Sequence, residues 1–242
     1  MAHGHPDWGV QAPTSKIYSM LDLGEVVVRL GAVGSVDRLG NVLVEDDFRN
    51  GIARVTLAHA GVGGDGGIAQ FPCRFGGHSV WLETGTGANP TSHVDLVCAY
   101  VTASRLGFEV YVAVDDEVMA ITLAPTIVGN GLAIVAGVRI NPVTSVLGIW
   151  AGGGVYTSVA TDAKVRDDAQ TFNVIKVVID AVTGQYIRIR VNDKTYDVSA
   201  YTAPSTAWGL ATWLQMRVYL DGALATSGTG YVDGLIVTEN EP

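Results

Sequence analysis

The stretch FNVIKVVIDAVTGQYIRIRVNDKTYDVSAY, residues 172–201, decides the fold class. It contains three short runs rich in β-branched and aromatic residues, which are typical of strands. Links of only a few residues, with glycine, asparagine and aspartate among them, separate the runs, and such short links join antiparallel neighbours. The stretch therefore predicts a three-stranded antiparallel meander with strands at residues 173–180, 186–191 and 195–198.

The distribution of apolar residues predicts how such strands are covered. Residues 186–191 (YIRIRV) and 108–112 (FEVYV) alternate between apolar and polar, so each strand is expected to have one face toward the core. Arg188 and Arg190 should then share the solvent side. The first run of the meander and residues 213–220 (WLQMRVYL) are apolar almost throughout, which predicts strands covered on both faces.

Outward from the meander, residues 45–238 repeat a short strand followed by a turn. We find no long segment with a 3.6-residue apolar period, so crossover helices and a parallel sheet are not expected. The prediction is an all-β fold, an antiparallel two-sheet sandwich at residues 45–242. Residues 1–44 are predicted to be an extended N-terminal arm followed by a small β-hairpin region, with a short helix at residues 19–29 as the alternative.

Composition and charge exclude several classes of protein. The 242 residues carry a formal net charge of −9, which argues against nucleic acid as the main partner. Hydrophobic residues make up 48% of the chain, yet we find no apolar run of the roughly 18 residues that a membrane-spanning helix needs. Residues 1–10 lack the features of a signal peptide, so Cys73 and Cys98 are expected to be buried free thiols. We therefore expect neither nucleic acid nor a membrane as a partner.

Three segments together resemble the concanavalin-like, or laminin-G-like, jelly roll. They are VEDDF at residues 44–48, the meander, and GYVDGLIVT at residues 230–238. The resemblance implies an antiparallel jelly-roll sandwich whose first and last strands lie side by side. It also implies that the meander supplies neighbouring strands of the curved sheet.

The N-terminal sequence HPDWG at residues 5–9, followed by a polar arm, resembles the start of bacteriophage and prophage virion proteins. This resemblance implies a non-enzymatic virion structural protein, a capsid decoration, cement or appendage protein at the virion surface. We expect a symmetric homo-oligomer, a trimer, that binds the capsid or another virion protein. Trp8 and Tyr18 of the arm are the candidate contact residues, because aromatic side chains often anchor such contacts.

A carbohydrate-binding, receptor-binding module is the alternative function. Sugar rings stack on the exposed faces of Trp and Tyr side chains, so aromatic residues on a sheet face are candidates for a glycan site. Each of them can equally be a core residue of a large sandwich. The candidates are Trp81, Trp150 and Trp208, and after them Trp213, Tyr156 and Tyr201.

A polysaccharide-acting enzyme is the third possibility. Residues 61–66 (GVGGDG) match the dinucleotide-binding pattern G-x-G-x-x-G, but the sequence IAQFP after them cannot begin the helix that the site requires. Residues 45–50 (EDDFRN) lack the last acid of a laminarinase-type E-x-D-x-x-E pattern. Residues 115–117 (DDE) are better explained as a solvated turn. We therefore predict no catalytic and no cofactor-binding residues.

A structural calcium ion is a further possibility at the junction of the first and last strands. If those strands pair as the resemblance implies, Asp46, Asp47 and Asp233 approach one another, and calcium prefers carboxylate oxygens. The alternative, which we favour, is that these acids protect a sheet edge against the addition of another strand.

Overall fold

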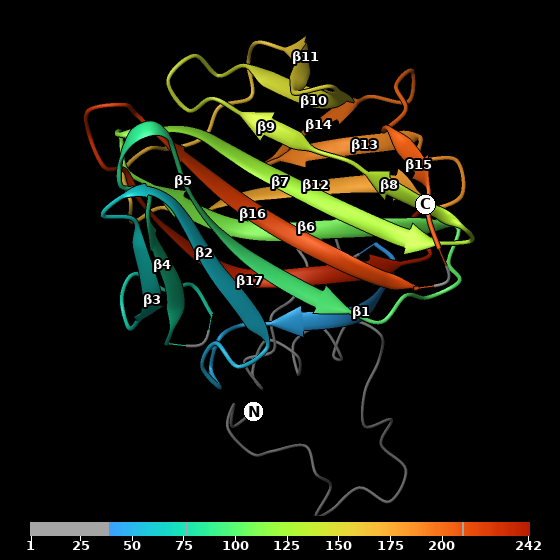
Figure 1. The fold of residues 1–242 in the computed structure, drawn as a ribbon, viewed down its shortest axis with the longest axis horizontal. Coiled ribbons are helices and arrows are strands. Elements are labelled where there is room, and N and C mark those ends of the chain that lie inside the picture. Colours follow the sequence, from blue (N-terminus) through green and yellow to red (C-terminus); the bar gives the residue numbers. More distant parts are fainter. Residues whose placement is uncertain (1–38, 76, 210) are drawn as a thin grey trace, which may run out of the picture. The chain divides into compact units, whose positions relative to one another are not determined.

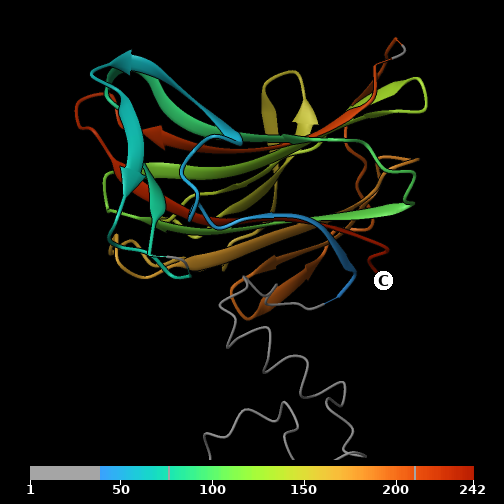
Figure 2. The same cartoon turned by 90° about the horizontal axis from the view of Figure 1, so that it is seen from below.

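The protein is described here from a computed structural model, which places residues 39–75, 77–209 and 211–242. Within these ranges the chain forms seventeen strands and no helix. The strands form two antiparallel sheets that pack face to face (Figures 1 and 2). The predicted all-β two-sheet sandwich is therefore confirmed. The arm with Trp8 and Tyr18, and the alternative helix at residues 19–29, lie outside the described residues.

Sheet A has eight strands, seven of them in the order β14-β13-β12-β6-β17-β4-β3, and β1 pairs with β17. Their bounds are β1 (Asn41–Asp46), β3 (Asp65–Ala69), β4 (Ser79–Glu83), β6 (Arg105–Val114), β12 (Asn173–Asp180), β13 (Tyr186–Val191), β14 (Lys194–Asp197) and β17 (Thr229–Glu239).

Sheet B has nine strands, seven of them in the order β11-β10-β9-β7-β16-β5-β2. The other two, β8 and β15, pair with each other, and β8 also pairs with β7. Their bounds are β2 (Val55–Val62), β5 (Thr86–Cys98), β7 (Val118–Gly129), β8 (Leu132–Val135), β9 (Val138–Ile140), β10 (Leu147–Gly152), β11 (Val155–Ala160), β15 (Ser205–Ala207) and β16 (Trp213–Gly222).

Two features of the sequence-based topology are confirmed. The meander is present as β12, β13 and β14, each paired antiparallel with the next. The first described strand lies beside the last, with Glu45 opposite Ile236 and Asp46 opposite Leu235. Strand β1 begins at Asn41, and the predicted division of the chain between residues 44 and 45 stays a prediction.

The core lies between the sheets and is built from alternate residues of each strand. Phe108 and Val110 of β6 face it from sheet A, and Leu123 of β7 and Val218 of β16 face it from sheet B. All four side chains are fully buried. Because successive side chains of a strand point to opposite faces, the residues between the core residues lie on the other face of each sheet. We call the two faces turned away from the core the outer faces.

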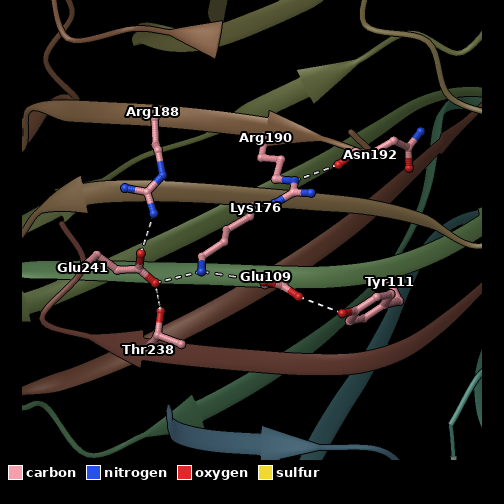
Figure 3. A network of polar contacts seen from close by, with 8 residues as sticks. All are labelled: Glu109, Tyr111, Lys176, Arg188, Arg190, Asn192, Thr238 and Glu241. Atoms are coloured by element: carbon pink, nitrogen blue, oxygen red, sulfur yellow. Dashed lines mark hydrogen bonds and ion pairs between the residues drawn. The ribbon is translucent and has the colours of Figure 1, made fainter. Parts of the chain in front are cut away.

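The outer face of sheet A was expected to meet solvent, but charged side chains on this face are buried. Glu109 on β6, Lys176 on β12 and Glu241 after β17 are at most 3% exposed (Figure 3). The Lys176 ammonium lies 2.8 Å from Glu241 Oε1, and Arg188 lies 2.6 Å from Glu241 Oε2. Residues 108–112 are therefore covered on both faces, and Arg188 contacts a buried carboxylate rather than bulk water.

Strand β16 was predicted to be covered on both faces, but it is covered on one face only, because residues 213–220 alternate between half-buried and buried. Strand β12 is covered on both faces, as predicted. No helix in the described ranges is long and apolar enough to span a membrane.

Candidate functional site

A row of polar and aromatic side chains crosses the outer face of sheet B. The strand register places His93 of β5 opposite Tyr219 of β16, Tyr219 opposite Thr122 of β7, and Thr122 opposite Arg139 of β9. The row continues to β10 and β11, where Gly148 lies opposite Ser158. Six strands thus present residues to one surface, which we call the sheet B face.

Asp95 and Arg217 form the charged centre of one half of the sheet B face. Arg217 donates from Nε to Asp95 Oδ1 and from Nη2 to Oδ2, both at 2.5 Å. Its Nη1 donates to the Tyr219 hydroxyl at 2.8 Å, and the Tyr219 ring lies 4.9 Å from the His93 ring. A bidentate pair of this kind holds both side chains in one geometry. Burial lowers the pKa of His93, so its ring is neutral near pH 7.

Arg139 is the charged residue of the other half of the sheet B face. Its Nη2 lies 2.9 Å from Asp221 Oδ2. The guanidinium also lies over the Tyr156 ring at 5.5 Å, and the Tyr156 and Trp150 rings meet edge to face at 5.2 Å. Burial raises the pKa of Asp221, and the charge of Arg139 opposes this shift. The Arg139 guanidinium, the Trp150–Tyr156 pair and the Asp221 carboxylate therefore form one connected group.

Two glycines make room for the aromatic pair. A Cβ atom at Gly148 would lie 3.2 Å from the Cβ of Tyr156, and one at Gly137 would lie 3.0 Å from the Cβ of Trp150. Beneath them, the Tyr186 hydroxyl reaches across the core from β13, accepting from Gly137 N–H at 2.9 Å and lying within donating distance of Gly137 O at 3.3 Å. Burial raises the pKa of Tyr186 to about 12, so the hydroxyl keeps its proton. The backbone under the aromatic pair is thus held by both sheets.

A pocket of about 270 Å³ opens beside this group. In Figure 2 the β10–β11 hairpin, coloured yellow, rises from sheet B on the side away from sheet A. The hairpin and the turn between β9 and β10 supply most of the pocket wall. The polar lining comes from Arg139, Asn141, Thr144, Tyr156 and Ser158, with Gly148 and Val146 completing it.

The structure brings one of the three main tryptophan candidates to this site. Trp150 is half-buried on β10 at the sheet B face. Trp81 is half-buried on β4, in sheet A, where it lies opposite Tyr231. Trp208 is 50% exposed and follows β15, where its N–H donates to Gly131 O. Of the further candidates, Tyr156 is part of the site, whereas Tyr201 and Trp213 lie elsewhere on the chain and are not among the pocket residues.

Each of the predicted calcium ligands has partners within the protein, and the calcium site itself stays a prediction. Asp47 pairs with Arg49 at 2.6 Å, and Asp233 Oδ2 accepts the N–H groups of Arg74 and Phe75 at 2.5 and 3.0 Å. Asp46 Oδ1 accepts the N–H of Phe48 at 3.0 Å. The other carboxylate oxygens, Oδ2 of Asp46 and Oδ1 of Asp233, are buried, and none of the described residues donates a hydrogen bond to them. In the part of the chain that the structure describes, no three His, Cys, Asp or Glu side chains are placed to hold a metal ion.

The other motifs have structural roles. Residues 61–66 form the turn from β2 into β3, and a strand rather than a helix follows them, as expected. Asp115 accepts N–H groups of its own turn and of Thr229. Cys73 and Cys98 are free thiols, as predicted, but both are only half-buried. Cys73 lies in the link between β3 and β4 rather than in a strand.

The polar residues of the sheet B face were not predicted from the sequence. Arg139 and Asp95 each stand between two apolar residues, whereas His93 follows a serine, and only the strand register brings the three together. A usable indication did exist in β16, where Gln215, Arg217, Tyr219 and Asp221 alternate with core residues. Counting Trp and Tyr as apolar obscured that period of two, although both residues are amphipathic.

Comparisons with known proteins agree with the architecture. A solved structure of peanut lectin with a nine-residue peptide is similar to this chain with a TM-score of 0.52 and 11% identity, over 81% of this chain and 96% of the lectin. The fold is a concanavalin-like jelly roll. A Bacillus subtilis protein of unknown function with a galectin-like fold matches with a TM-score of 0.48 and 11% identity, over 83% of this chain and 97% of that chain. No family model matches the sequence, and no curated protein matches it significantly.

Proposed function

We propose that this protein is a carbohydrate-binding module whose glycan site is the sheet B face at β9, β10 and β11. The observation that carries the proposal is the Trp150–Tyr156 pair beside a 270 Å³ pocket with a polar lining. Sugars are bound by stacking of their apolar ring faces on aromatic side chains and by hydrogen bonds from fixed polar groups. The lectin-like fold supports this proposal more than it supports a purely structural role.

Preorganisation of the site is a further argument for binding. Arg217 is held by Asp95, and Arg139 by Asp221 and Tyr156, so these side chains lose little rotamer entropy when a ligand arrives. They are nevertheless accessible, since the Arg139 side chain is 42% exposed and that of Arg217 is 31% exposed. Fixed but accessible donors are what a hydroxyl-rich ligand requires.

A glycan array with the full chain, followed by calorimetric titration of the best ligand, tests the proposal. Trp150→Ala and Tyr156→Ala are each expected to weaken binding by about two- to tenfold, since the contact of one aromatic ring contributes about 0.5–1.5 kcal/mol beyond its buried area. Trp208→Ala is the matched control, because Trp208 is exposed and lies outside the pocket. An array without any bound glycan, or equal losses in all three variants, would refute the assignment.

The virion role predicted from HPDWG at residues 5–9 remains a separate proposal. Nothing in the comparisons links the chain to virion proteins, and its trimeric state and virion surface location still rest on the N-terminal sequence alone. A receptor-binding part of a virion would unite both functions. Light scattering on the full chain tests the assembly: a closed trimer supports it, and a monomer argues for a glycan-binding module that acts alone. Recovery of the bound glycan intact after incubation would distinguish a binding module from a polysaccharide-acting enzyme.

A further inference from the structure

We infer that the pocket at Arg139 selects an acidic sugar, a hexuronate whose carboxylate pairs with the guanidinium. The inference deepens the proposed function and rests on it. Among the described residues, seven line the pocket; Arg139 is the only one of these with a charge, and none is a carboxylate. The chain as a whole is acidic, with a formal net charge of −9. Because the protein as a whole is acidic, its net charge does not attract anions. The positive charge in this pocket therefore indicates that the pocket itself binds an anion.

The polar lining consists mainly of hydrogen-bond donors. A guanidinium has five N–H groups, and the ion pair with Asp221 uses Nη2. Asn141 accepts the N–H of Thr144 with its Oδ1 at 2.8 Å, so the turn between β9 and β10 holds the amide and leaves its NH₂ group to donate. The hydroxyl groups of Thr144 and Ser158 can donate as well. An ionised carboxylate only accepts hydrogen bonds, so it fits this set of donors better than a neutral hydroxymethyl group does.

The position of Asp221 explains why the guanidinium keeps donors for a ligand. Asp221 lies on β16 and contacts Arg139 from across β7, on the other side from the pocket, and it is not a lining residue. The Tyr156 ring supports the guanidinium through its face. A hexuronate ring stacked on the aromatic pair would bring its carboxylate to the open edge of Arg139. Planar guanidinium and planar carboxylate then pair in a fixed geometry.

The test is calorimetric titration of the full chain with three oligosaccharides, made of galacturonate, glucuronate and mannuronate, each compared with its methyl ester. The ester retains the sugar and linkage but removes the charge. At least one acid is expected to bind about tenfold or more tighter than its ester, the scale of a charged hydrogen bond. Arg139→Gln should abolish this difference by weakening the binding of the acid far more than that of the ester. Arg166→Gln, the same change at an exposed arginine outside the pocket, should leave both affinities unchanged.

Three results would overturn the inference. Equal affinities for acid and ester in the unmodified protein would show that the pocket does not select charge. A preference that persists in Arg139→Gln, or that Arg166→Gln reduces to the same extent, would show that the carboxylate is not bound at this residue. If esters and neutral array glycans bind without any preference for acids, the carbohydrate-binding function stands and only the acidic selectivity falls. If no glycan of any kind binds, both proposals fall.

Discussion

Replacing Lys176 with Met should strongly destabilise the sandwich, because the lysine is a charged partner inside a fully buried network. Its side chain is 1% exposed, and its Nζ lies 2.8 Å from Glu241 Oε1 and 3.7 Å from Glu109 Oε2. Methionine retains most of the apolar stem of lysine, so the loss is mainly electrostatic. Removing one partner of a buried ion pair costs about 3–5 kcal/mol, because the remaining charge stays desolvated.

The corresponding shift in the melting temperature is large enough to measure. In a domain of 150–250 residues, each kcal/mol lowers the midpoint by about 2–4 °C, so the expected decrease is about 6–20 °C. Lys194→Met is the matched control, since Lys194 pairs with Asp162 while both side chains are about half exposed. Exposed pairs contribute about 0–1 kcal/mol, so this variant should melt within about 4 °C of the unmodified protein.

Scanning calorimetry on the full chain measures both midpoints, and urea unfolding gives the free energies independently. A double-mutant cycle of Lys176→Met with Glu241→Gln should show a coupling energy of about 1 kcal/mol or more, because the residues contact each other directly. If the Lys176 and Lys194 variants melt within a few degrees of each other, the reasoning about buried charge on sheet A is wrong.

Three further predictions concern the sheet B face. Gly148→Ala should weaken glycan binding several-fold by displacing the aromatic pair, whereas Gly209→Ala, which meets no atom within 4 Å, should not; titration of both variants checks this. Asp221→Asn should raise the affinity for an acidic oligosaccharide by up to about fivefold, because a partly exposed pair of about 0.2–1 kcal/mol no longer competes for Arg139. Since burial raises the pKa of Asp221, the unmodified protein should also gain affinity as the pH falls toward that pKa, and Asp221→Asn should lose this dependence. Burial lowers the pKa of His93 below 6.5, so the unfolded chain takes up the proton more readily and stability should decrease as the pH falls below 6.5. Melting temperatures at about pH 7.5 and 5.5 should therefore differ less in His93→Gln than in the unmodified protein, and an equal difference would contradict this role for the ring.

The meander and the antiparallel sandwich could be predicted because both depend on local sequence. Turns of two to five residues fix antiparallel pairing, and period-two alternation fixes the core-facing side chains. The pairing of β1 with β17 came from a resemblance to known jelly rolls, since nothing local to residues 41–46 specifies a partner almost 200 residues away. The structure confirms both.

Burial of the outer face of sheet A could not be predicted from alternation. The rule assumes that a polar residue on the second face meets water. Here Glu109 accepts from the Tyr111 hydroxyl at 2.8 Å, Phe75 packs edge to face on the Tyr111 ring at 4.7 Å, and Glu241 reaches Lys176 from the end of the chain. Apart from Tyr111, which lies on the same strand as Glu109, these partners come from segments that only the tertiary fold brings together.

Only part of the candidate site could be predicted, because some of its contacts depend on the tertiary fold. Aromatic residue types identified Trp150 and Tyr156 as possible sugar platforms, because the chemistry of stacking is a property of the side chain itself. Their neighbours Arg139 and Asp221 lie on β9 and β16, and only sheet register places them beside each other. Sequence spacing carries no information on such a cross-strand contact.

The two outer faces carry similar residue types, and accessibility is what distinguishes their roles. On sheet A the charges of Lys176 and Glu241 are almost fully buried and contact each other, so a ligand would have to break existing ion pairs to reach them. On sheet B the charges of Arg139 and Arg217 are also paired, but the pairing leaves part of each guanidinium exposed beside a pocket or an aromatic ring. Pairing that fixes a side chain while leaving donors accessible lowers the entropic cost of binding without the full cost of desolvation. These differences support a stabilising role for the outer face of sheet A and the proposed ligand recognition at the sheet B face.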